Sequence, residues 1–450
     1  MDGDMTSGDI SRALLYFTLP LILSGLLQQC YSIADSLMVG NLIGEKALAA
    51  VGVAAPISNV FIFVVTGLVS GYTILLSQLY GAKDYPKAAR LTSTFFCFVL
   101  ACALPIAMLG FTLKGRLLAG LSTPTVLLQP AGEYLAVIFL GTPFVVLYNL
   151  YGSLLRGIGD SRTPLYSIVV STVVNLVLNF VFIRLGWGVR GVAVATVIAQ
   201  IASSLFLFAY VHRRHPSFRI RLRREAIDLV LFWECLRLGI PRIIQSSLSS
   251  VGSLALQNIR NSFGTDVVTA ISTAYKIDSL TLLPIINISV AISIFVGQNV
   301  GAGDMNRARQ GLKHGRRIIL PVAVGVTAIV VAFGGTFIKG FGVSDSVAAI
   351  GQRFFYFLGL FYPVMGLQSA YSGFLQGNKD VAFTSAAHII SLGVRVALSY
   401  ALAGLIGPDV IAVSEIFAWC LGALLCYWRY KSNRWLRTEP GFGEAEQAAQ

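Results

Sequence analysis

The sequence predicts an all-α polytopic membrane protein with twelve transmembrane helices, in two six-helix lobes related by pseudo-twofold symmetry. Composition is the first reason: residues of the AVILMFWYC set make up 55% of the chain, whereas Asp, Glu, Lys and Arg make up only 12%. Soluble domains carry roughly 25% charged residues. The second reason is that long apolar runs recur from end to end, with a mean hydropathy of +0.73. The third is that the second half of the chain repeats the first.

The apolar runs are each long enough to cross a bilayer, which takes about 20 helical residues. They predict helices at 13–39, 47–79, 91–112, 128–154, 164–187, 190–211, 234–259, 267–298, 315–337, 350–374, 382–405 and 410–429. The second and eighth runs are longer, so they are expected to tilt or to extend beyond the bilayer. The N-terminus lacks a cleavable signal pattern, so the first run is expected to remain as a span.

The basic residues predict the orientation. If the N-terminus is cytoplasmic, inner segments carry 23 Lys and Arg and outer segments carry 8. Because Lys and Arg concentrate on the cytoplasmic side, this places a multi-pass protein in the cell (inner) membrane with both termini cytoplasmic. The net charge of +13 comes from arginines between hydrophobic runs, so nucleic acid is not an expected partner. The lipid bilayer is, and the protein is expected to be a monomer.

The internal repeat appears at a constant shift of 220 positions. QLYGAKDYPKA, which contains Asp84, aligns with QNVGAGDMNRA, which contains Asp304, and LLRGIGD aligns with FLQGNKD. Six spans per repeat give both halves the same orientation, with the substrate path between them. The predicted lobes are residues 1–225 and 226–450, joined by a cytoplasmic linker near 211–229.

Ionisable side chains within the predicted spans are informative, because each costs roughly 2.5–3.5 kcal/mol at the bilayer centre. In the first half, Asp35 follows Gln28, Tyr31 and Ser32 by seven, four and three residues, so these four form one polar stripe on a helix. Facing a wet cavity, Asp35 would exchange a proton or bind Na⁺. The alternative is a carboxylate near the outer end of the helix that simply faces water.

Two asparagines of the first half are further candidates. Asn175 and Asn179 are one turn apart and share a face of the fifth predicted helix. Amide pairs in membrane helices often serve only as interhelical hydrogen bonds. Together with Asp35 and the Thr196 hydroxyl they could instead hold Na⁺, since hard cations accept neutral oxygens.

The second half carries its own charges, Lys276, Asp278, Arg395 and Glu415. Lys276 and Asp278 are two residues apart and therefore point to different sides of their helix. Each is expected to find a partner on another helix, such as Arg395 or Glu415. Two interpretations stay open: a structural ion network that fixes helix packing, or a second site for substrate or for proton coupling.

No pattern indicates an enzyme. The sequence contains no Ser/His/Asp set, and its six cysteines form neither a CxxC nor a Cys/His metal pattern. The GAKD and GAGD motifs lack the Gly-Lys-Ser/Thr of a phosphate loop, and they instead predict a turn followed by a helix N-cap. We expect no cofactor apart from a coupling ion, H⁺ or Na⁺, and no firm metal site beyond the candidate Na⁺ set above.

Four segments resemble the multidrug and toxic compound extrusion (MATE) family. They are PLILSGLLQQCYSIADSLMVGNLIGEKALAAVGVAAPI from Pro20, SQLYGAKD with its counterpart FVGQNVGAGDMNRAR, LRGIGDSRTPL leading into NLVLNFVFI, and GVRGVAVATVIAQ. The resemblance implies a twelve-helix antiporter that exports organic compounds on a proton or sodium gradient by rocking of two lobes. Asp35 matches the family's helix-one acid. Where the family usually has Asp one turn after Asn175, this chain has Asn179, so a sodium site would be weaker.

The sequence therefore predicts an antiporter that exports small amphiphilic, often cationic, organic compounds in exchange for protons or sodium by alternating access. The alternative is a lipid-linked oligosaccharide flippase of the related superfamily, for which cationic residues such as Lys276 and Arg395 would suit an anionic head group. A membrane-embedded enzyme or receptor is disfavoured by the near-symmetric repeat. Substrate, coupling ion and the role of the second-half charges are left open.

Overall fold

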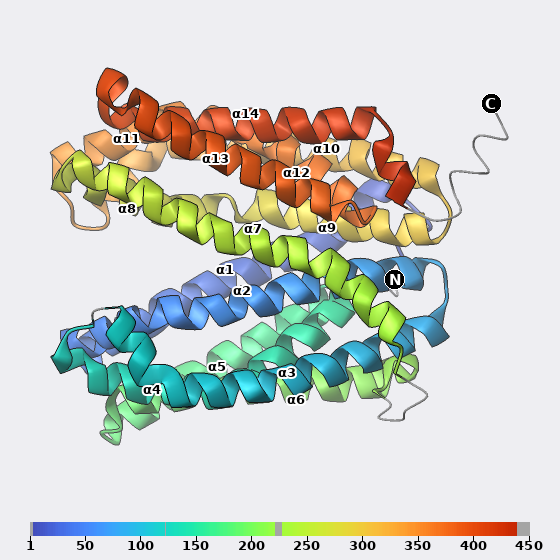
Figure 1. The fold of residues 1–450 in the computed structure, drawn as a ribbon, viewed down its shortest axis with the longest axis horizontal. Coiled ribbons are helices and arrows are strands. Elements are labelled where there is room, and N and C mark those ends of the chain that lie inside the picture. Colours follow the sequence, from blue (N-terminus) through green and yellow to red (C-terminus); the bar gives the residue numbers. More distant parts are fainter. Residues whose placement is uncertain (1–2, 122, 221–226, 439–450) are drawn as a thin grey trace. The chain divides into compact units, whose positions relative to one another are not determined.

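A computed structural model describes residues 3–121, 123–220 and 227–438, and all regular structure in these ranges is helical (Figure 1). The first half holds α1 (Ile10–Leu42), α2 (Glu45–Gly81), α3 (Tyr85–Gly120), α4 (Thr125–Gly157), α5 (Arg162–Arg184), α6 (Gly188–Arg214) and η1 (Pro216–Phe218). The second half holds α7 (Leu229–Ser262), α8 (Thr265–Thr281), α9 (Leu283–Gly301), α10 (Met305–Lys339), α11 (Asp345–Gly359), α12 (Tyr362–Gly377), α13 (Val381–Ile406), η3 (Gly407–Asp409), α14 (Val410–Lys431) and η4 (Arg434–Thr438).

Within the described ranges, nine stretches are long and apolar enough to cross a membrane, or ten when the bent pair α11 and α12 counts as one span. One of the nine, Val381–Lys431, contains both α13 and α14. α7 is not among them, because serines, amides and arginines interrupt its apolar residues. Each of the twelve predicted runs nevertheless coincides with described helix, and the predicted fold class, an all-α polytopic membrane protein, is confirmed.

Two runs that were predicted as single helices are each two helices. The run 267–298 is α8 and α9, which meet at Leu282, and the run 350–374 is α11 and α12, which are bent by 50° to one another. Pro284 and Pro363 are the second residues of α9 and α12. Proline has no backbone N–H to continue the preceding helix, yet its fixed φ suits the start of a new one. Apolar content alone does not reveal such breaks.

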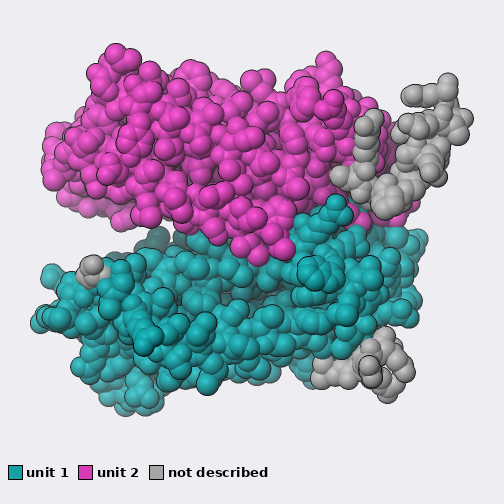
Figure 2. Space-filling view, in the orientation of Figure 1, with its two compact units in different colours: residues 1–4, 19–239 teal, residues 5–18, 240–450 magenta. Residues whose placement is uncertain are grey.

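The chain forms two compact units (Figure 2). Unit 1 consists of Met1–Asp4 and Leu19–Gly239, and unit 2 of Met5–Thr18 and Ile240–Gln450. The division thus falls inside α1 and inside α7, in each case one residue before a proline, Pro20 or Pro241. Each unit therefore combines one half of the chain with the first turns of a helix whose remainder belongs to the other unit.

In unit 1 the first turns of α7 pack tightly on α2. Leu231 and Cys235 are 2% and 0% exposed. A Cβ added to Gly71 would lie 2.5 Å from the carbonyl oxygen of Cys235 and 2.7 Å from the backbone nitrogen of Gly239. Glycine is needed at position 71 because any side chain would push the two helix backbones apart.

In unit 2 the segment before α1 is held by side chains of α9 and α10. The Met5 N–H donates to Gln298 Oε1 at 2.9 Å, and Asn299 Nδ2 donates to the Met5 carbonyl at 3.2 Å. Arg307 Nη2 donates to the carbonyl of Ser7 at 2.9 Å. These contacts satisfy backbone groups that precede the first helical turn, and they hold the segment before α1 on this unit.

The repeat is visible in the geometry of its turns. Asp84 and Asp304 cap α3 and α10 by accepting from backbone N–H groups three residues on, at 3.0 and 2.8 Å. The residues before them, Lys83 and Gly303, have φ of 58° and 78°. The backbone N–H of each aspartate donates to a carbonyl of the preceding helix. This pattern is expected where a helix ends in a single residue with left-handed backbone conformation. The predicted turn and N-cap in GAKD and GAGD are therefore confirmed.

The second pair of repeated aspartates has diverged. Asp160 Oδ1 caps α5 by accepting from the backbone N–H groups of Arg162 and Thr163, both at 3.0 Å. Asp380 instead forms an ion pair with Arg429 of α14, at 2.7 Å, with side chains 4% and 18% exposed. One repeat position thus supplies a helix cap in the first half and a buried ion pair in the second.

This divergence predicts unequal costs for the same substitution. Asp380→Ala leaves a largely buried guanidinium without its partner and should cost about 3 kcal/mol. Asp160→Ala removes a cap and should cost about 1 kcal/mol. Thermal unfolding of the purified variants in one detergent measures both, and Asp380→Ala with Arg429→Met should recover much of the loss. Equal shifts for the two alanine variants would contradict the assignment.

Candidate ion-coupling and substrate site

A hydrogen-bonded chain of polar side chains crosses α1, α5 and α6 inside unit 1. Asn179 Nδ2 donates to Asp35 Oδ1 at 2.5 Å and to Asn175 Oδ1 at 2.7 Å. Asn175 Nδ2 in turn donates to Thr196 Oγ1 at 3.2 Å. The structure therefore brings together the four residues that the sequence singled out for a cation or proton site.

Burial differs along this chain. Asn175 and Asn179 are both 0% exposed, whereas Asp35 and Thr196 are partly exposed. Both hydrogens of the Asn179 amide are donated, one to Asp35 and one to Asn175. The Oδ1 atom of Asn179 is also buried, and the described residues offer it no hydrogen-bond partner. An unsatisfied buried acceptor costs about 1–3 kcal/mol. This oxygen therefore marks a point where a proton donor, a water or a cation would be stabilised.

The predicted stripe on α1 divides into two parts. Tyr31 lies beside both Asp35 and the hydroxyl of Thr196, so it belongs to the network. Gln28 and Ser32 are exposed, and their side chains have no described hydrogen bond. Of the four residues in the stripe, Tyr31 and Asp35 therefore belong to the network, whereas Gln28 and Ser32 do not.

Small residues set the distance between α5 and α6. α6, which packs on both α4 and α5, contains Ala193, Ala195 and Ala199, which are 0–1% exposed. Ser203 Oγ donates across to the backbone carbonyl of Ser167 on α5 at 2.9 Å. Small side chains allow membrane helices to approach closely. This approach brings Thr196 within reach of Asn175, although the two are far apart along the chain.

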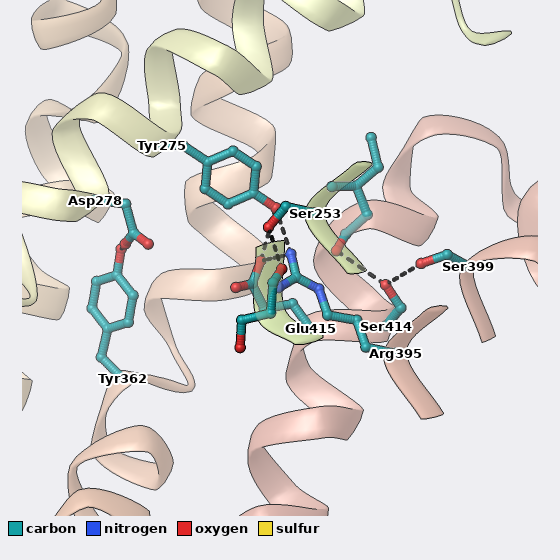
Figure 3. Close-up of polar contacts among 10 residues, drawn as sticks. Ser253, Tyr275, Asp278, Tyr362, Arg395, Ser399, Ser414 and Glu415 are labelled. Atoms are coloured by element: carbon teal, nitrogen blue, oxygen red, sulfur yellow. Dashed lines mark hydrogen bonds and ion pairs between the residues drawn. The ribbon is translucent and has the colours of Figure 1, made fainter. Parts of the chain in front are cut away.

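A second polar cluster lies in unit 2, between α8, α13 and α14 (Figure 3). Arg395 Nη2 donates to Glu415 Oε2 at 2.8 Å and to the Tyr275 hydroxyl at 2.7 Å, and that hydroxyl donates to the same carboxylate oxygen at 3.0 Å. The side chains of Arg395 and Glu415 are 18% and 9% exposed. The three groups close a triangle in which the positive and negative charges neutralise one another.

The other two charges of the second half are placed differently from expectation. Asp278 accepts from the Tyr362 hydroxyl at 2.5 Å, beside the Arg395 cluster in Figure 3, rather than forming an ion pair with Arg395. Lys276 is exposed and lies over the ring of Phe341 at 5.9 Å. Asp278 therefore does find a partner on another helix, Tyr362 of α12, but the suggested partners Arg395 and Glu415 were wrong for both residues.

Sequence reasoning missed two groups of polar side chains. Tyr275 and Tyr362 complete the second cluster, but within apolar runs they read as ordinary aromatic residues. The other group is a run of α7 serines whose hydroxyls donate to carbonyls four residues back, including Ser246 to Arg242 and Ser253 to Ser249. Spacing by threes and fours was the signal that could have identified this serine face.

The donor set in unit 1 suits a hard cation. It offers one carboxylate, two amide oxygens and one hydroxyl, which are ligands that Na⁺ accepts. Clusters of three or more His, Cys, Asp or Glu that could hold a transition metal are absent from the described ranges. The six cysteines are free thiols, with Cys235 and Cys426 buried and Cys30 and Cys102 exposed. The arrangement can bind and release a small cation or a proton, but it contains no nucleophile with an adjacent base.

An apolar, repeated helical fold that holds a carboxylate and an amide network inside its spanning helices is the kind of architecture that a polytopic membrane transporter requires. The MatE family model matches this chain at residues 20–181 and again at 241–401. The protein belongs to this family, whose members are transporters and not enzymes. The two matches follow one another at about the spacing of the internal repeat, and the resemblance stated from the sequence is confirmed.

Individual relatives agree over almost the full length. The chain is 29% identical over 441 residues to the probable multidrug resistance protein YpnP of Bacillus subtilis, covering 96% of this chain and 97% of that protein. It is 25% identical to the probable multidrug resistance protein NorM of Thermotoga maritima, covering 91% and 90%. A solved MATE structure in a bent conformation has the same fold, with a TM-score of 0.90, 21% identity and coverage of 97% and 98%.

The triangle in unit 2 supports a test of the two interpretations left open for it. Glu415→Ala would leave the Arg395 guanidinium buried and unpaired and should destabilise the protein by about 3 kcal/mol. Tyr275→Phe should cost only about 1 kcal/mol. Thermal unfolding in detergent measures both changes, and a Glu415→Ala variant as stable as the parent would contradict the geometry.

Its role in transport is then separated from its role in packing. Replacing the pair together, Arg395→Met with Glu415→Leu, should restore most of the stability because no lone charge remains. A structural network predicts that this double variant still exports. A folded double variant without export would assign the cluster to the transport path instead.

Proposed function

We propose that this transporter is a secondary active antiporter that exports small amphiphilic, often cationic, organic compounds, and that Asp35 is its ion-coupling group. The observation that carries the proposal is the hydrogen bond between Asp35 Oδ1 and Asn179 Nδ2. It joins a partly exposed carboxylate to a fully buried amide pair inside spanning helices. The names of the full-length relatives, both probable multidrug resistance proteins, support the class of substrate.

The network favours the proton as the coupling ion. With Asp35 ionised, the Asn179 amide donates to it, as observed. With Asp35 protonated, the carboxyl group becomes a donor, and a half-turn of the amide would present Asn179 Oδ1, the oxygen that lacks a partner, as its acceptor. An amide can thus satisfy both protonation states of one carboxyl group. Asp35 would change its proton occupancy when water reaches it from one side and then the other.

Sodium is the second candidate. The same Asn179 oxygen, together with the oxygens of Asp35, Asn175 and Thr196, would supply neutral and charged ligands for Na⁺. Binding would require the amide of Asn179 to release its two present acceptors. One carboxylate then balances the charge of the ion, so the affinity should be lower than with two.

The alternative function, a lipid-linked oligosaccharide flippase, would need unpaired positive charge in the second half to attract an anionic head group. Arg395 would have to attract an anionic head group, yet its charge is already neutralised by Glu415 at 2.8 Å. Lys276 is exposed and remains a cation without a described carboxylate partner. Of the two cations proposed for this role, only Lys276 lacks a described carboxylate partner, and a single cation is a poor site for a pyrophosphate, so the exporter is the better proposal. Location in the cell membrane with both termini cytoplasmic, and action as a monomer, are further parts of this proposal.

We expect Asp35→Asn to fold and insert but to lose most uphill export, because it keeps the shape of the side chain while removing titration. The measurement is efflux of a fluorescent lipophilic cation from proteoliposomes under a proton gradient or a sodium gradient imposed separately. Asn179→Asp should retain export and gain sodium dependence by adding a second negative ligand. Asp35→Asn that pumps as well as the parent would make Asp35 structural and shift the search to Asp278 or Glu415.

The orientation is tested with single cysteines in a cysteine-free background. Ser217, in the linker, is exposed and expected inside, while Ser346, before the second turn of α11, is exposed and expected outside. In intact cells a membrane-impermeant thiol reagent should label Ser346→Cys and spare Ser217→Cys. Permeabilised cells provide the control, where both should react. The reverse pattern would invert the topology.

A further inference from the structure

A basic pocket lies in unit 2 between the start of α10 and the end of α14. Its volume is about 530 Å³. Tyr430 of α14 lines it together with four cations of α10, Arg309, Lys313, Arg316 and Arg317. Leu312 and Leu320 add apolar side chains to the lining. The four cations recur at three- and four-residue spacing, so they share one helix face where the basic first turns of α10 give way to its apolar span.

These charges are not used by the rest of the described chain. None of the four cations forms an ion pair with a described carboxylate. Arg309 and Arg316 lie against the rings of Trp435 and Tyr371, at 5.7 and 5.5 Å, which fixes their direction without neutralising them. Arg316 Nε is buried and has no hydrogen-bond partner among the described residues. Four neighbouring cations without a carboxylate partner among the described residues point to an anion outside the described chain.

The internal repeat shows that the pocket is not a by-product of the architecture. At the shift of 220 residues, the positions equivalent to the four cations hold uncharged residues: Ala89, Ser93, Phe96 and Cys97. The turn that precedes them is otherwise reproduced, with an aspartate cap in both halves. The second half therefore carries positive charge at a place where the first half forms the same turn and helix without it.

The surroundings are those of a membrane–water interface. Trp428 and Tyr427 of α14, close in sequence to Tyr430, are 51% and 44% exposed. Exposed Trp and Tyr concentrate at the level of lipid head groups. Basic pockets between transmembrane helices at this level suit the head groups of anionic lipids. The cations, the aromatic side chains and the apolar Leu320 together match a phosphate joined to acyl chains.

We propose that this pocket binds the phosphate head group of an anionic phospholipid. The guanidinium groups of Arg309 and Arg316 hold the phosphate, because Arg matches phosphate oxygens with fixed donors. Lys313 and Arg317, which are exposed, add charge at the rim. The lipid site is distinct from the Asp35 network and does not depend on the proposed coupling ion.

The test uses the full-length protein purified in a neutral detergent and titrated with dioleoyl phosphatidylglycerol, with dioleoyl phosphatidylcholine as the matched neutral lipid. Bound lipids are counted by native mass spectrometry, and the thermal unfolding midpoint is followed in parallel. The parent should retain phosphatidylglycerol saturably and rise in midpoint, and phosphatidylcholine should do neither. Equal retention of the two lipids would overturn the proposal.

Two variants locate the site. Lys313→Gln with Arg317→Gln should weaken phosphatidylglycerol binding about tenfold or more, since each cation near an anionic surface contributes about 1 kcal/mol. The matched control is Arg213→Gln with Arg214→Gln, which removes two exposed cations at the end of α6. It should bind as the parent does. Equal loss in both double variants, or loss in neither, would contradict a specific pocket.

A final arm separates a lipid from a soluble anion. Inorganic phosphate at the same phosphate concentration should leave the unfolding midpoint of the parent unchanged. A phosphate-induced rise equal to that given by the lipid, and absent from Lys313→Gln with Arg317→Gln, would assign the pocket to a free anion and overturn the lipid proposal. Both double variants carry exposed substitutions, so their midpoints without lipid should match that of the parent, which confirms that they fold.

Discussion

The structure depends on one constraint: in the hydrocarbon of a bilayer no water is present to pair with polar groups, so the chain must pair them itself. The backbone pairs its polar groups by forming helices throughout the described ranges. The polar side chains find partners in three ways. Serines of α7 donate to carbonyls of their own helix. Arg395 and Glu415 neutralise one another. Asp35 is solvated by the Asn179 amide in place of water.

The two clusters differ in the kind of polar atom that they leave without a hydrogen-bond partner among the described residues. In the Arg395 triangle this atom is a donor, Arg395 Nε, while the charges of Arg395 and Glu415 pair with one another, which suits a packing element. The Asn179 amide uses both hydrogens but leaves its oxygen buried and unpaired. A site that must gain and lose an ion cannot be fully satisfied in one state, since the ion would then gain nothing by binding. An unpaired acceptor beside a carboxylate can receive a proton donor or a cation, so the Asp35 network fits a coupling role better than the neutralised Arg395 triangle does.

The sequence predicted the features that depend on neighbours along one helix or on the repeat. Helical spacing placed Asn175 and Asn179 on one face, and the shift of 220 residues predicted matching caps at Asp84 and Asp304. Features that depend on which helices meet were not predictable. Tyr362 contacts Asp278 from another helix, and nothing local distinguishes it from other aromatic residues. Prolines stand at the helix breaks at Leu282 and before Tyr362. Proline alone could not predict these breaks, because other prolines, such as Pro105 of α3, lie inside continuous helices.

The central claim is that Asp35 exchanges a proton within this network. Infrared difference spectroscopy of the protein in lipid, recorded between acidic and alkaline pH, detects the C=O stretch of each protonated carboxyl group directly and requires no transported compound. The account predicts a carboxyl band in the parent that is absent from Asp35→Asn, retained in Glu415→Gln, and shifted in Asn179→Ala because its hydrogen-bond partner is lost. Identical spectra for the parent and Asp35→Asn would contradict it.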